Sequence, residues 1–253
     1  MADRIEARRD SNAELAWRVL RREPAIGIPS WGLFAMEHRE IERLAGAAPG
    51  AYAQDPDGVY LAMQRRVGTC YIDQYIPRNP LTMGDHGFEG GAAHGATTGA
   101  QAIVVDGMAI DGPEAVAAHL EAHIWPALRR EIAACNPHDD AAVAALIEGE
   151  RAVQRVFGPA ILKTPYAGFN ALPSLRYGTY GYAAYLMAYG LYPEVMERDF
   201  TLQAELARRQ NQLAARAIVE GGLAPVVRLD HDMADARGTL VSVRSLERLW
   251  LPH

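Results

Sequence analysis

Apolar residues follow two spacings along this chain. Short apolar runs that end in turn-forming residues predict strands at 25–32, 69–76, 160–166 and 226–229. Between these runs, apolar residues recur every three or four positions, which predicts helices at 10–22, 38–45, 57–67, 114–134, 141–157, 172–189, 193–220 and 243–250. Strands that alternate with helices of this length favour a parallel sheet with crossover helices. The pattern therefore predicts an α/β fold.

One segment, residues 78–112, interrupts the alternation. Its first part is rich in glycine, but these glycines do not follow a strand and open a helix, as a phosphate-binding loop would require. Its second part is apolar on both sides of Asp106-Gly107, a pair typical of a hairpin turn. We expect a glycine-rich loop and a hairpin inserted into a single domain that spans residues 1–253.

Composition narrows the function classes. The chain has 253 residues, of which 49% are hydrophobic, and a net charge of −6 without a basic cluster. These values are typical of a globular protein and argue against a nucleic-acid partner. The longest apolar run, 182–192, is too short to cross a bilayer, and the charged N-terminus does not resemble a signal peptide. We therefore expect a cytoplasmic protein with no membrane partner, whose Cys70 and Cys135 are reduced thiols.

The most highly charged strand end follows the apolar run 226–229. Alternation along a strand would place Asp230 and Asp232 on one side, where two carboxylates could hold a cation, orient a substrate N–H or share a proton. The alternative is structural: Asp230 would pair with Arg228 or Arg237, and Asp232 or Asp235 would cap the next turn. We expect Asp230 and Asp232 to be catalytic.

The loop after the first predicted strand supplies a second set of candidates. Trp31, Met36 and His38 follow this strand closely. They could line a pocket, with Trp31 and Met36 in contact with substrate and His38 catalytic. Alternatively, they form a hydrophobic lid followed by the charged start of a helix.

Polar residues within the other apolar strands complete the predicted site. Asp73 lies in the second strand, and a buried carboxylate there needs a partner or a function. Lys163 and Tyr166 lie at the end of the third strand. We expect Asp73, Lys163, Tyr166 and Arg237 to bind substrate, although Lys163 could instead be the counter-ion of Asp73.

Two further patterns have structural explanations. His119 and His123 are four residues apart on a predicted helix, but no third ligand is suggested and the H-E-x-x-H order is absent. We therefore predict a solvent-exposed helix face and no metal site. The tyrosines between Tyr166 and Tyr192 recur near helical spacing and indicate a packing or dimer surface.

Several motifs resemble those of the uroporphyrinogen decarboxylase superfamily. The run R-L-D-H-D-M-A-D-A-R-G-T-L-V-S-V-R-S-L-E-R-L-W-L-P-H resembles a family segment in which an acidic strand end precedes R-G or K-G and a helix ending in a hydrophobic-Pro pair. The motifs E-G-G-L, Y-P-E-V-M and F-G-P-A-I-L-K-T fit the same family, and the match runs in order from about Arg18 to the C-terminus. The resemblance implies a TIM barrel.

The resemblance also implies a function. The superfamily contains the decarboxylases of porphyrin synthesis and cobamide-dependent methyltransferases that act on methanol, methylamines, coenzyme M or aryl methyl ethers. The decarboxylases carry an arginine-rich loop after the first strand, whereas the loop here, S-W-G-L-F-A-M-E-H-R-E, has Arg39 alone. This departure favours the methyltransferase branch: methyl transfer from a small substrate to a corrinoid or thiol acceptor, with a corrinoid protein as a possible partner. A decarboxylase of a porphyrinogen or smaller acid, and a non-catalytic half barrel that binds a ligand or partner chain, are the alternatives.

The extent of the match bears on cofactors and assembly. In the methyltransferase branch a His-x-Cys pair and a later Cys bind zinc, and these ligands would lie beyond His253. No cofactor is therefore evident in this chain, and zinc and a corrinoid are implied by the resemblance alone. The chain is expected to form an incomplete TIM-barrel-like fold of about four βα units plus a hairpin insertion. Because such a fold has open sheet edges, we expect a homo-oligomer, such as a dimer.

Overall fold

The chain folds as two compact units in the computed structural model, which describes residues 11–32, 34–35, 37–78, 96–97, 100, 102–231, 233–235 and 237–253. Unit 1 comprises the described parts of Met1–Gly91, Asp140–Phe169 and Ala215–Arg228. Unit 2 comprises those of Ala92–Asp139, Asn170–Ala214 and Leu229–His253. Each unit thus combines three separate segments of the chain, and the single domain expected over 1–253 stays a prediction.

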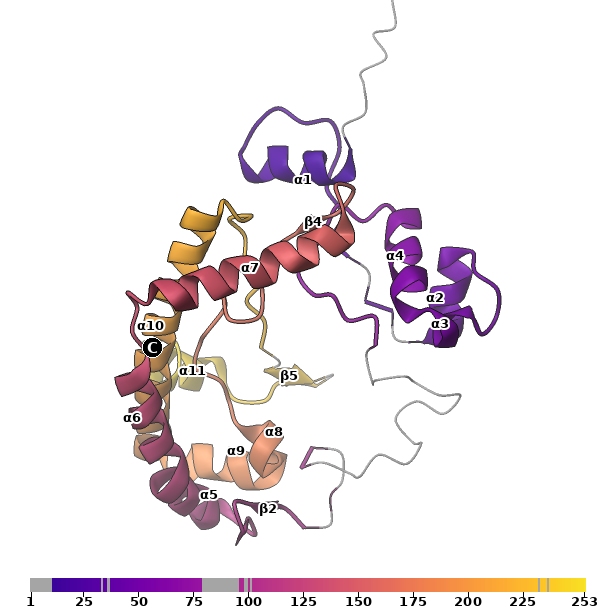
Figure 1. Cartoon of the computed structure of the whole chain (residues 1–253). Coiled ribbons are helices and arrows are strands. Elements are labelled where there is room, and N and C mark those ends of the chain that lie inside the picture. The colour runs from indigo at the N-terminus through magenta and orange to yellow at the C-terminus, as the bar shows by residue number, and fades with distance from the viewer. Residues whose placement is uncertain are drawn as a thin grey trace, which may run out of the picture. The chain divides into compact units, whose positions relative to one another are not determined.

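Unit 1 contains five complete helices. They are α1 (Asn12–Leu20), α2 (His38–Ala45), α3 (Ala51–Gln54), α4 (Pro56–Arg66) and α7 (Asp140–Phe157). The side chains of Ser11, Glu37 and Asp55 accept backbone N–H groups at the starts of α1, α2 and α4, which fixes where these helices begin. Helices α2, α3 and α4 pack against one another and lie side by side in Figure 1.

The sheet of unit 1 is short and parallel. Strand β1 (Tyr71–Ile72) pairs with β4 (Leu162–Lys163), and Trp31 forms a parallel bridge to Tyr71 on the other side of β1. Three of the four predicted strands therefore lie next to one another in chain order. Gly32 is required beside this bridge, because a Cβ there would come within 2.5 Å of the Ile72 side chain.

The fourth predicted strand, at 226–229, is wrong. These residues form a loop in which the N–H of Val226 bonds to the carbonyl of Ala224. Pro225 has no N–H to offer a neighbouring strand, and this local turn uses the next donor. A β-branched apolar run was therefore not sufficient to form a sheet.

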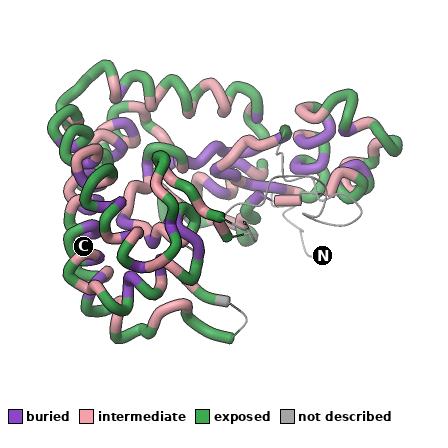
Figure 2. The backbone as a smooth tube through the Cα atoms, turned by 90° about the horizontal axis from the view of Figure 1, so that it is seen from below, coloured by how far each residue is buried: buried purple, intermediate pink, exposed green. Residues whose placement is uncertain are grey.

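Two apolar clusters stabilise unit 1. In the larger one, Ile41, Tyr60 and Met63 from α2 and α4 pack with Ile72 and Phe157. In the smaller one, small residues of α1 pack with Cys70, Leu162 and Ala224. Along α7 only Val143 and Phe157 are buried, and the other residues of this helix are half-buried or exposed, as the pink and green colours of Figure 2 denote.

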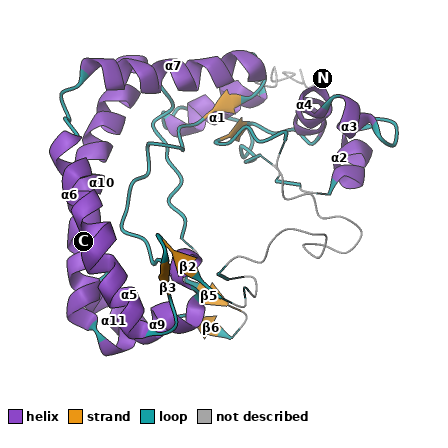
Figure 3. Cartoon of the chain, turned by 60° about the horizontal axis from the view of Figure 1, so that its bottom comes forward, coloured by secondary structure: helices purple, strands orange, loops and turns teal. Residues whose placement is uncertain are grey.

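Unit 2 is mainly helical and carries two hairpins, drawn as short orange arrows in Figure 3. Its elements are β2 (Val104–Val105), β3 (Met108–Ala109), α5 (Pro113–His119), η1 (Leu120–Ile124), α6 (Trp125–Ala134), α8 (Tyr177–Tyr180), α9 (Tyr182–Leu191), β5 (Ala234–Asp235), β6 (Gly238–Thr239) and α11 (Val243–Leu249). The hairpin predicted at Asp106-Gly107 is confirmed: β2 and β3 are antiparallel, and both turn residues have positive φ, 49° and 79°. The single helix predicted over 114–134 is interrupted by η1, one π-helical turn.

Helix α10 (Pro193–Gly221) contributes residues to both units. Within unit 2, its Met196 and Phe200 are buried in one cluster with Tyr180, Tyr185 and Tyr189. The predicted tyrosine surface is thus, at these three positions, a packing surface.

The α/β class is confirmed in its coarse form, since helices combine with short strands. The described strands form three two-stranded sheets and no closed barrel. Within the same described residues, none of the helices has the length and apolar character needed to cross a membrane.

Candidate functional site

Arg228 lies at the centre of a side-chain cluster in unit 1. Its Nε donates a hydrogen bond to Oδ2 of Asp73 at 2.7 Å. Its guanidinium carbon lies 5.0 Å from the ring centre of Trp31, 5.7 Å from that of Phe34 and 4.4 Å from that of Tyr166. These distances are those of cation–π contacts, so three aromatic rings surround one guanidinium group.

The parallel sheet explains why these residues meet. Trp31 forms the bridge to β1, Asp73 directly follows β1, and Tyr166 follows β4. The carboxyl ends of parallel strands meet at one edge, where α/β proteins commonly bind ligands. The structure therefore brings together three of the predicted substrate-binding residues, Trp31, Asp73 and Tyr166.

Asp73 is the most unusual member of the cluster. Its side chain is only 3% exposed, yet its Oδ1 accepts no hydrogen bond from any described residue. A buried acceptor without a donor costs about 1–3 kcal/mol. The N–H or O–H group of a small ligand, or a water molecule, would satisfy this oxygen.

A second ion pair lies on the neighbouring strand. The Nζ of Lys163 donates to Oε2 of Glu150 at 2.5 Å and to the carbonyl of Thr164 at 2.8 Å. Burial raises the pKa of Glu150 above its ordinary value, the hydrogen bond and charge of Lys163 oppose this, and the negative charge of Asp73 adds to it. Lys163 is therefore the counter-ion of Glu150, and Asp73 pairs with Arg228.

These two pairs make the edge electrically balanced. Two positive side chains, Arg228 and Lys163, each face one carboxylate, Asp73 and Glu150. The described edge therefore carries no excess positive charge, and it is walled by aromatic rings. This arrangement suits a neutral or weakly charged ligand better than a polyanion.

The other predicted site residues lie elsewhere. His38 begins α2, and its ring lies 4.4 Å from that of Tyr52, so it packs between helices. Asp230 and Arg237 are exposed residues of unit 2. Met36 and Asp232 lie outside the described residues. The alternation that would have paired Asp230 with Asp232 does not apply at Asp230, because residues 226–231 form a loop.

The sequence indicated Arg228 only as a possible partner of Asp230, and it indicated no role for Phe34. A signal for Arg228 was present. It is the one charged residue in an apolar run, and Asp73 is the one charged residue in another. Because a buried charge needs a partner, two such lone charges of opposite sign predict each other.

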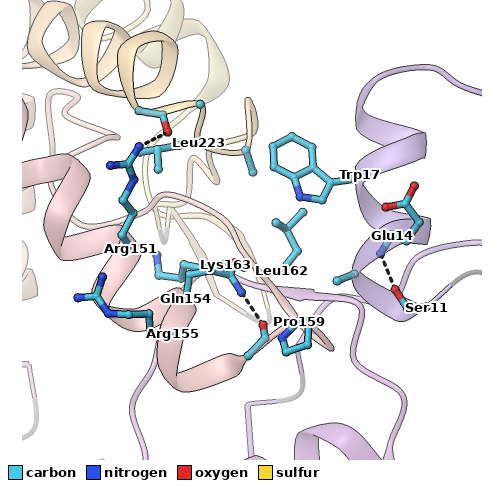
Figure 4. Close-up of a pocket in the computed structure, with 15 residues that line it drawn as sticks. Ser11, Glu14, Trp17, Arg151, Gln154, Arg155, Pro159, Leu162, Lys163 and Leu223 are labelled. Carbon is cyan, nitrogen blue, oxygen red and sulfur yellow. Dashed lines mark hydrogen bonds between the residues drawn. The ribbon is translucent and has the colours of Figure 1, made fainter.

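The opposite edge of the sheet has a cavity of about 720 Å³ (Figure 4). It is lined by residues of α1, the last turns of α7 and the loops that precede β4 and Pro225, among them Trp17, Glu14, Arg151 and Arg155. Arg151 donates to the carbonyl of Gly221, and Arg155 pairs with Glu148. The amino ends of parallel strands usually serve stability rather than chemistry, so we place the candidate site at Arg228.

The expectation for His119 and His123 is wrong in part. His123 is exposed, but His119 is fully buried in unit 2. Burial lowers the pKa of His119, the nearby His123 lowers it further, and Asp106 opposes both. The hairpin turn brings Asp106 to this helix, where it lies close to both histidines.

A scan against protein-family models, a search of curated proteins and a search of solved structures each found no match to this chain.

Proposed function

We propose that unit 1 carries the substrate site of an enzyme that transfers a methyl group from a small, neutral methylated molecule to a corrinoid or thiol acceptor. The reaction class rests on the resemblance of the sequence motifs to the uroporphyrinogen decarboxylase superfamily. The location rests on the cluster around Arg228. We also propose that the parallel order of Trp31, β1 and β4 belongs to a TIM-barrel-like fold.

The observation that carries the proposal is the buried oxygen of Asp73 that has no hydrogen-bond donor among the described residues. Arg228 holds one carboxylate oxygen at 2.7 Å, and the other has no described donor although the side chain is buried. A substrate N–H or O–H that bonds to this oxygen would be fixed in orientation. Asp73 is thus a substrate-positioning residue, and its pairing with Arg228 keeps its carboxylate in place.

The aromatic rings supply the rest of the binding site. Trp31 and Tyr166 contact the Arg228 guanidinium from unit 1, and they offer flat apolar surface to a methyl or aryl group. During transfer, the bond between the methyl carbon and the substrate heteroatom breaks, and its electron pair stays on the heteroatom, which takes up a proton from the thiol acceptor or, when a corrinoid is the acceptor, from water. The acceptor supplies the electron pair of the new bond.

The paired charges at the sheet edge favour this proposal over decarboxylation of a porphyrinogen. A substrate with several carboxylates needs several unpaired cations, whereas Arg228 and Lys163 each face a carboxylate. This supports a neutral substrate. Decarboxylation of a smaller acid is the alternative that the same site would permit, if the acid displaced Asp73 from Arg228.

A thiolate zinc site does not fit the described residues. Cys70 is buried beside Ser30 in unit 1, with Sγ 3.6 Å from the serine hydroxyl, and Cys135 belongs to unit 2. No His-x-Cys pair is present in the sequence. We therefore derive no step through zinc for this site.

The decisive experiment compares the purified wild-type protein with Asp73→Asn. Both would be assayed with methanol, methylamines, a methyl thioether and an aryl methyl ether, each with a reduced corrinoid and, separately, a thiol as acceptor. We expect turnover of one donor class by the wild type and a loss of about 100-fold in kcat/KM in the variant, the scale expected when a substrate is no longer held in its reactive orientation.

The matched control is Glu148→Gln, which removes an exposed carboxylate of the same unit that pairs with Arg155. It should leave kcat/KM unchanged. Equal activity of Asp73→Asn and wild type would contradict the site. Turnover of uroporphyrinogen, with no methyl transfer, would replace the proposal by the decarboxylase alternative.

A further inference from the structure

Three potential ligands meet in unit 2, whereas the Arg228 cluster belongs to unit 1. They are a carboxylate oxygen of Asp106, a ring nitrogen of the buried His119 and a ring nitrogen of His123, and all three atoms lie within 4.8 Å of one another. We propose that Asp106, His119 and His123 form a binding site for a divalent transition-metal ion. The inference does not depend on the proposed function of unit 1.

The distances suit a metal ion of this kind. Zinc lies about 2.1 Å from nitrogen and oxygen ligands, so two ligands at a tetrahedral centre are about 3.4 Å apart. Nε2 of His119 and Oδ2 of Asp106 are already 3.2 Å apart. The remaining, longer separation can close by rotation of side chains, because Asp106 and His123 are both exposed.

The local backbone holds the three residues in place. Asp106 occupies the first position of the tight turn between β2 and β3, where positive φ at both turn residues fixes its direction. His119 ends α5, and His123 lies in the π-helical turn η1 that follows. Single π-helical turns inside α-helices frequently occur at functional sites. Here the turn stacks the two imidazole rings, with centres 4.8 Å apart and planes at 18°.

A buried hydroxyl completes the arrangement. Nδ1 of His119 is 2.9 Å from the hydroxyl of Tyr180, a fully buried residue of α8. Histidines that bind metals usually bond through their other ring nitrogen to a second group, which fixes the tautomer and the ring orientation. With Nδ1–H donating to Tyr180, Nε2 presents its lone pair toward Asp106, and a cation between the two is the expected occupant.

The chemistry of the ligands restricts which ion binds. Two imidazoles and one carboxylate suit zinc, cobalt, nickel or iron(II) better than magnesium or calcium, which prefer oxygen ligands. Three protein ligands also leave a coordination position for water, and two of them face solvent. The cavity beside Tyr180 measures about 280 Å³, below the usual range for organic ligands, so the inference concerns the ion alone.

The competing explanation needs no metal. Nε2–H of His119 would donate to Asp106, and the Tyr180 hydroxyl would donate to Nδ1, which satisfies all three groups by hydrogen bonds. His123 would then be a stacked neighbour without a chemical role. The two explanations differ in what Asp106→Asn and His123→Gln do to metal binding.

The test is titration of the chelator-treated, full-length protein with Zn²⁺ by calorimetry, followed by metal analysis after dialysis. We expect wild type to bind one more ion than Asp106→Asn and than His123→Gln. Both variants change exposed side chains, and Asn is accepted at positive φ in this turn, so the fold should be kept. His138→Gln, an exposed histidine of the same unit, is the matched control and should bind as wild type does.

Two further measurements distinguish a metal ion bound by these three ligands from metal bound nonspecifically to the protein. Co²⁺ should give a visible absorption band in wild type that both ligand variants lose. Tyr180→Phe should keep the stoichiometry but weaken Zn²⁺ binding by about 10–100-fold, the usual effect of losing a group that orients a ligand. Equal ion content in wild type and both ligand variants, or no bound ion in wild type, would overturn the proposal in favour of the hydrogen-bonded triad.

Discussion

Among the described residues, each unit has one ion pair of an arginine with a buried aspartate, and the two pairs differ in how completely the carboxylate is bonded. In unit 2, Arg176 holds both oxygens of Asp199, with Nε at 2.8 Å from Oδ2 and Nη2 at 3.2 Å from Oδ1. Gln203 adds a third hydrogen bond to Oδ2 at 2.7 Å. In unit 1, Arg228 holds only one oxygen of Asp73.

The difference supports a structural role for the Asp199 pair and the functional role that we propose for the Asp73 pair. Asp199 is fully buried and bonded at both oxygens, as expected of a group that orders a core. Burial lowers the pKa of Arg176 while the hydrogen bond and charge of Asp199 raise it, and the net shift is upward. Asp73 is nearly as buried, but one of its oxygens has no described donor, and it lies at the sheet edge where we propose that substrate binds. A buried ion pair is therefore informative only when the bonds to each oxygen are counted.

The largest expected effect is on stability, and it separates the two carboxylates. Asp199→Asn disrupts a fully buried carboxylate that is bonded at both oxygens, and should lower the free energy of unfolding by about 3–5 kcal/mol. Asp73→Asn should cost about 1–3 kcal/mol, because Arg228 bonds to only one oxygen of Asp73. Urea unfolding followed by circular dichroism would measure both. Equal losses in the two variants would remove the distinction between the pairs.

Replacement of each arginine by lysine should change the free energy of unfolding by less, and it tests how each arginine bonds to its carboxylate. Arg176→Lys keeps the charge but cannot bond to both oxygens of Asp199, so about 1.5–3 kcal/mol should be lost. Arg228→Lys can still reach the single bonded oxygen of Asp73, and loses mainly ring contacts worth about 0.5–1 kcal/mol. The same urea experiment measures both, and a larger loss for Arg228→Lys would contradict the one-oxygen description of its pair.

The smallest expected effect is a pH dependence that reports the charge of Asp73. Because the folded pKa of Glu150 is raised above its ordinary value of 4.5, the folded state binds the proton more tightly than the unfolded state. The stability that Glu150 contributes is therefore complete below pH 4.5 and decreases as pH rises through the folded pKa. Urea midpoints of wild type and Glu150→Gln should diverge across this range, in favour of the variant as pH rises.

The same Glu150→Gln substitution in an Asp73→Asn background tests whether Asp73, and not Asp199, acts on Glu150. Asp73 adds to the raised pKa of Glu150, whereas no effect of Asp199 on that pKa is seen. The divergence that Glu150→Gln produces should therefore shrink when the substitution is made in an Asp73→Asn background. A full-sized divergence there would show that the two charges do not interact.

Much of the secondary structure followed from spacing alone. Three features depend only on local or nearest-neighbour residues. They are the apolar periods of α7 and α10, the hairpin turn at Asp106-Gly107, and the pairing of the strands at Tyr71 and Leu162. The strand expected at 226–229 failed because a local turn after Pro225 used a donor that a sheet would need. The π-helical turn at Leu120–Ile124 was not predicted from the spacing of apolar residues.

The candidate sites were harder to predict, because they depend on distant residues. Trp31, Asp73 and Tyr166 were identified as separate strand-end residues, but the residue that joins them, Arg228, is 155 positions from Asp73. Asp106 reaches His119 only through a hairpin turn whose direction depends on the fold of unit 2. Spacing along one element could find His119 and His123, but not the residue that approaches from another element.

The separation of Asp73 and Arg228 also has a consequence for biosynthesis. At a translation rate of about 5–20 residues per second, roughly 8–30 s pass between the synthesis of these two residues. During this interval the ribosome must also produce Asn170–Ala214, which belongs to unit 2. Until Arg228 is synthesised, the carboxylate of Asp73 in the nascent chain lacks its counter-charge, and the aromatic rings of the cluster lack the guanidinium that they contact. Molecular chaperones could recognise this state.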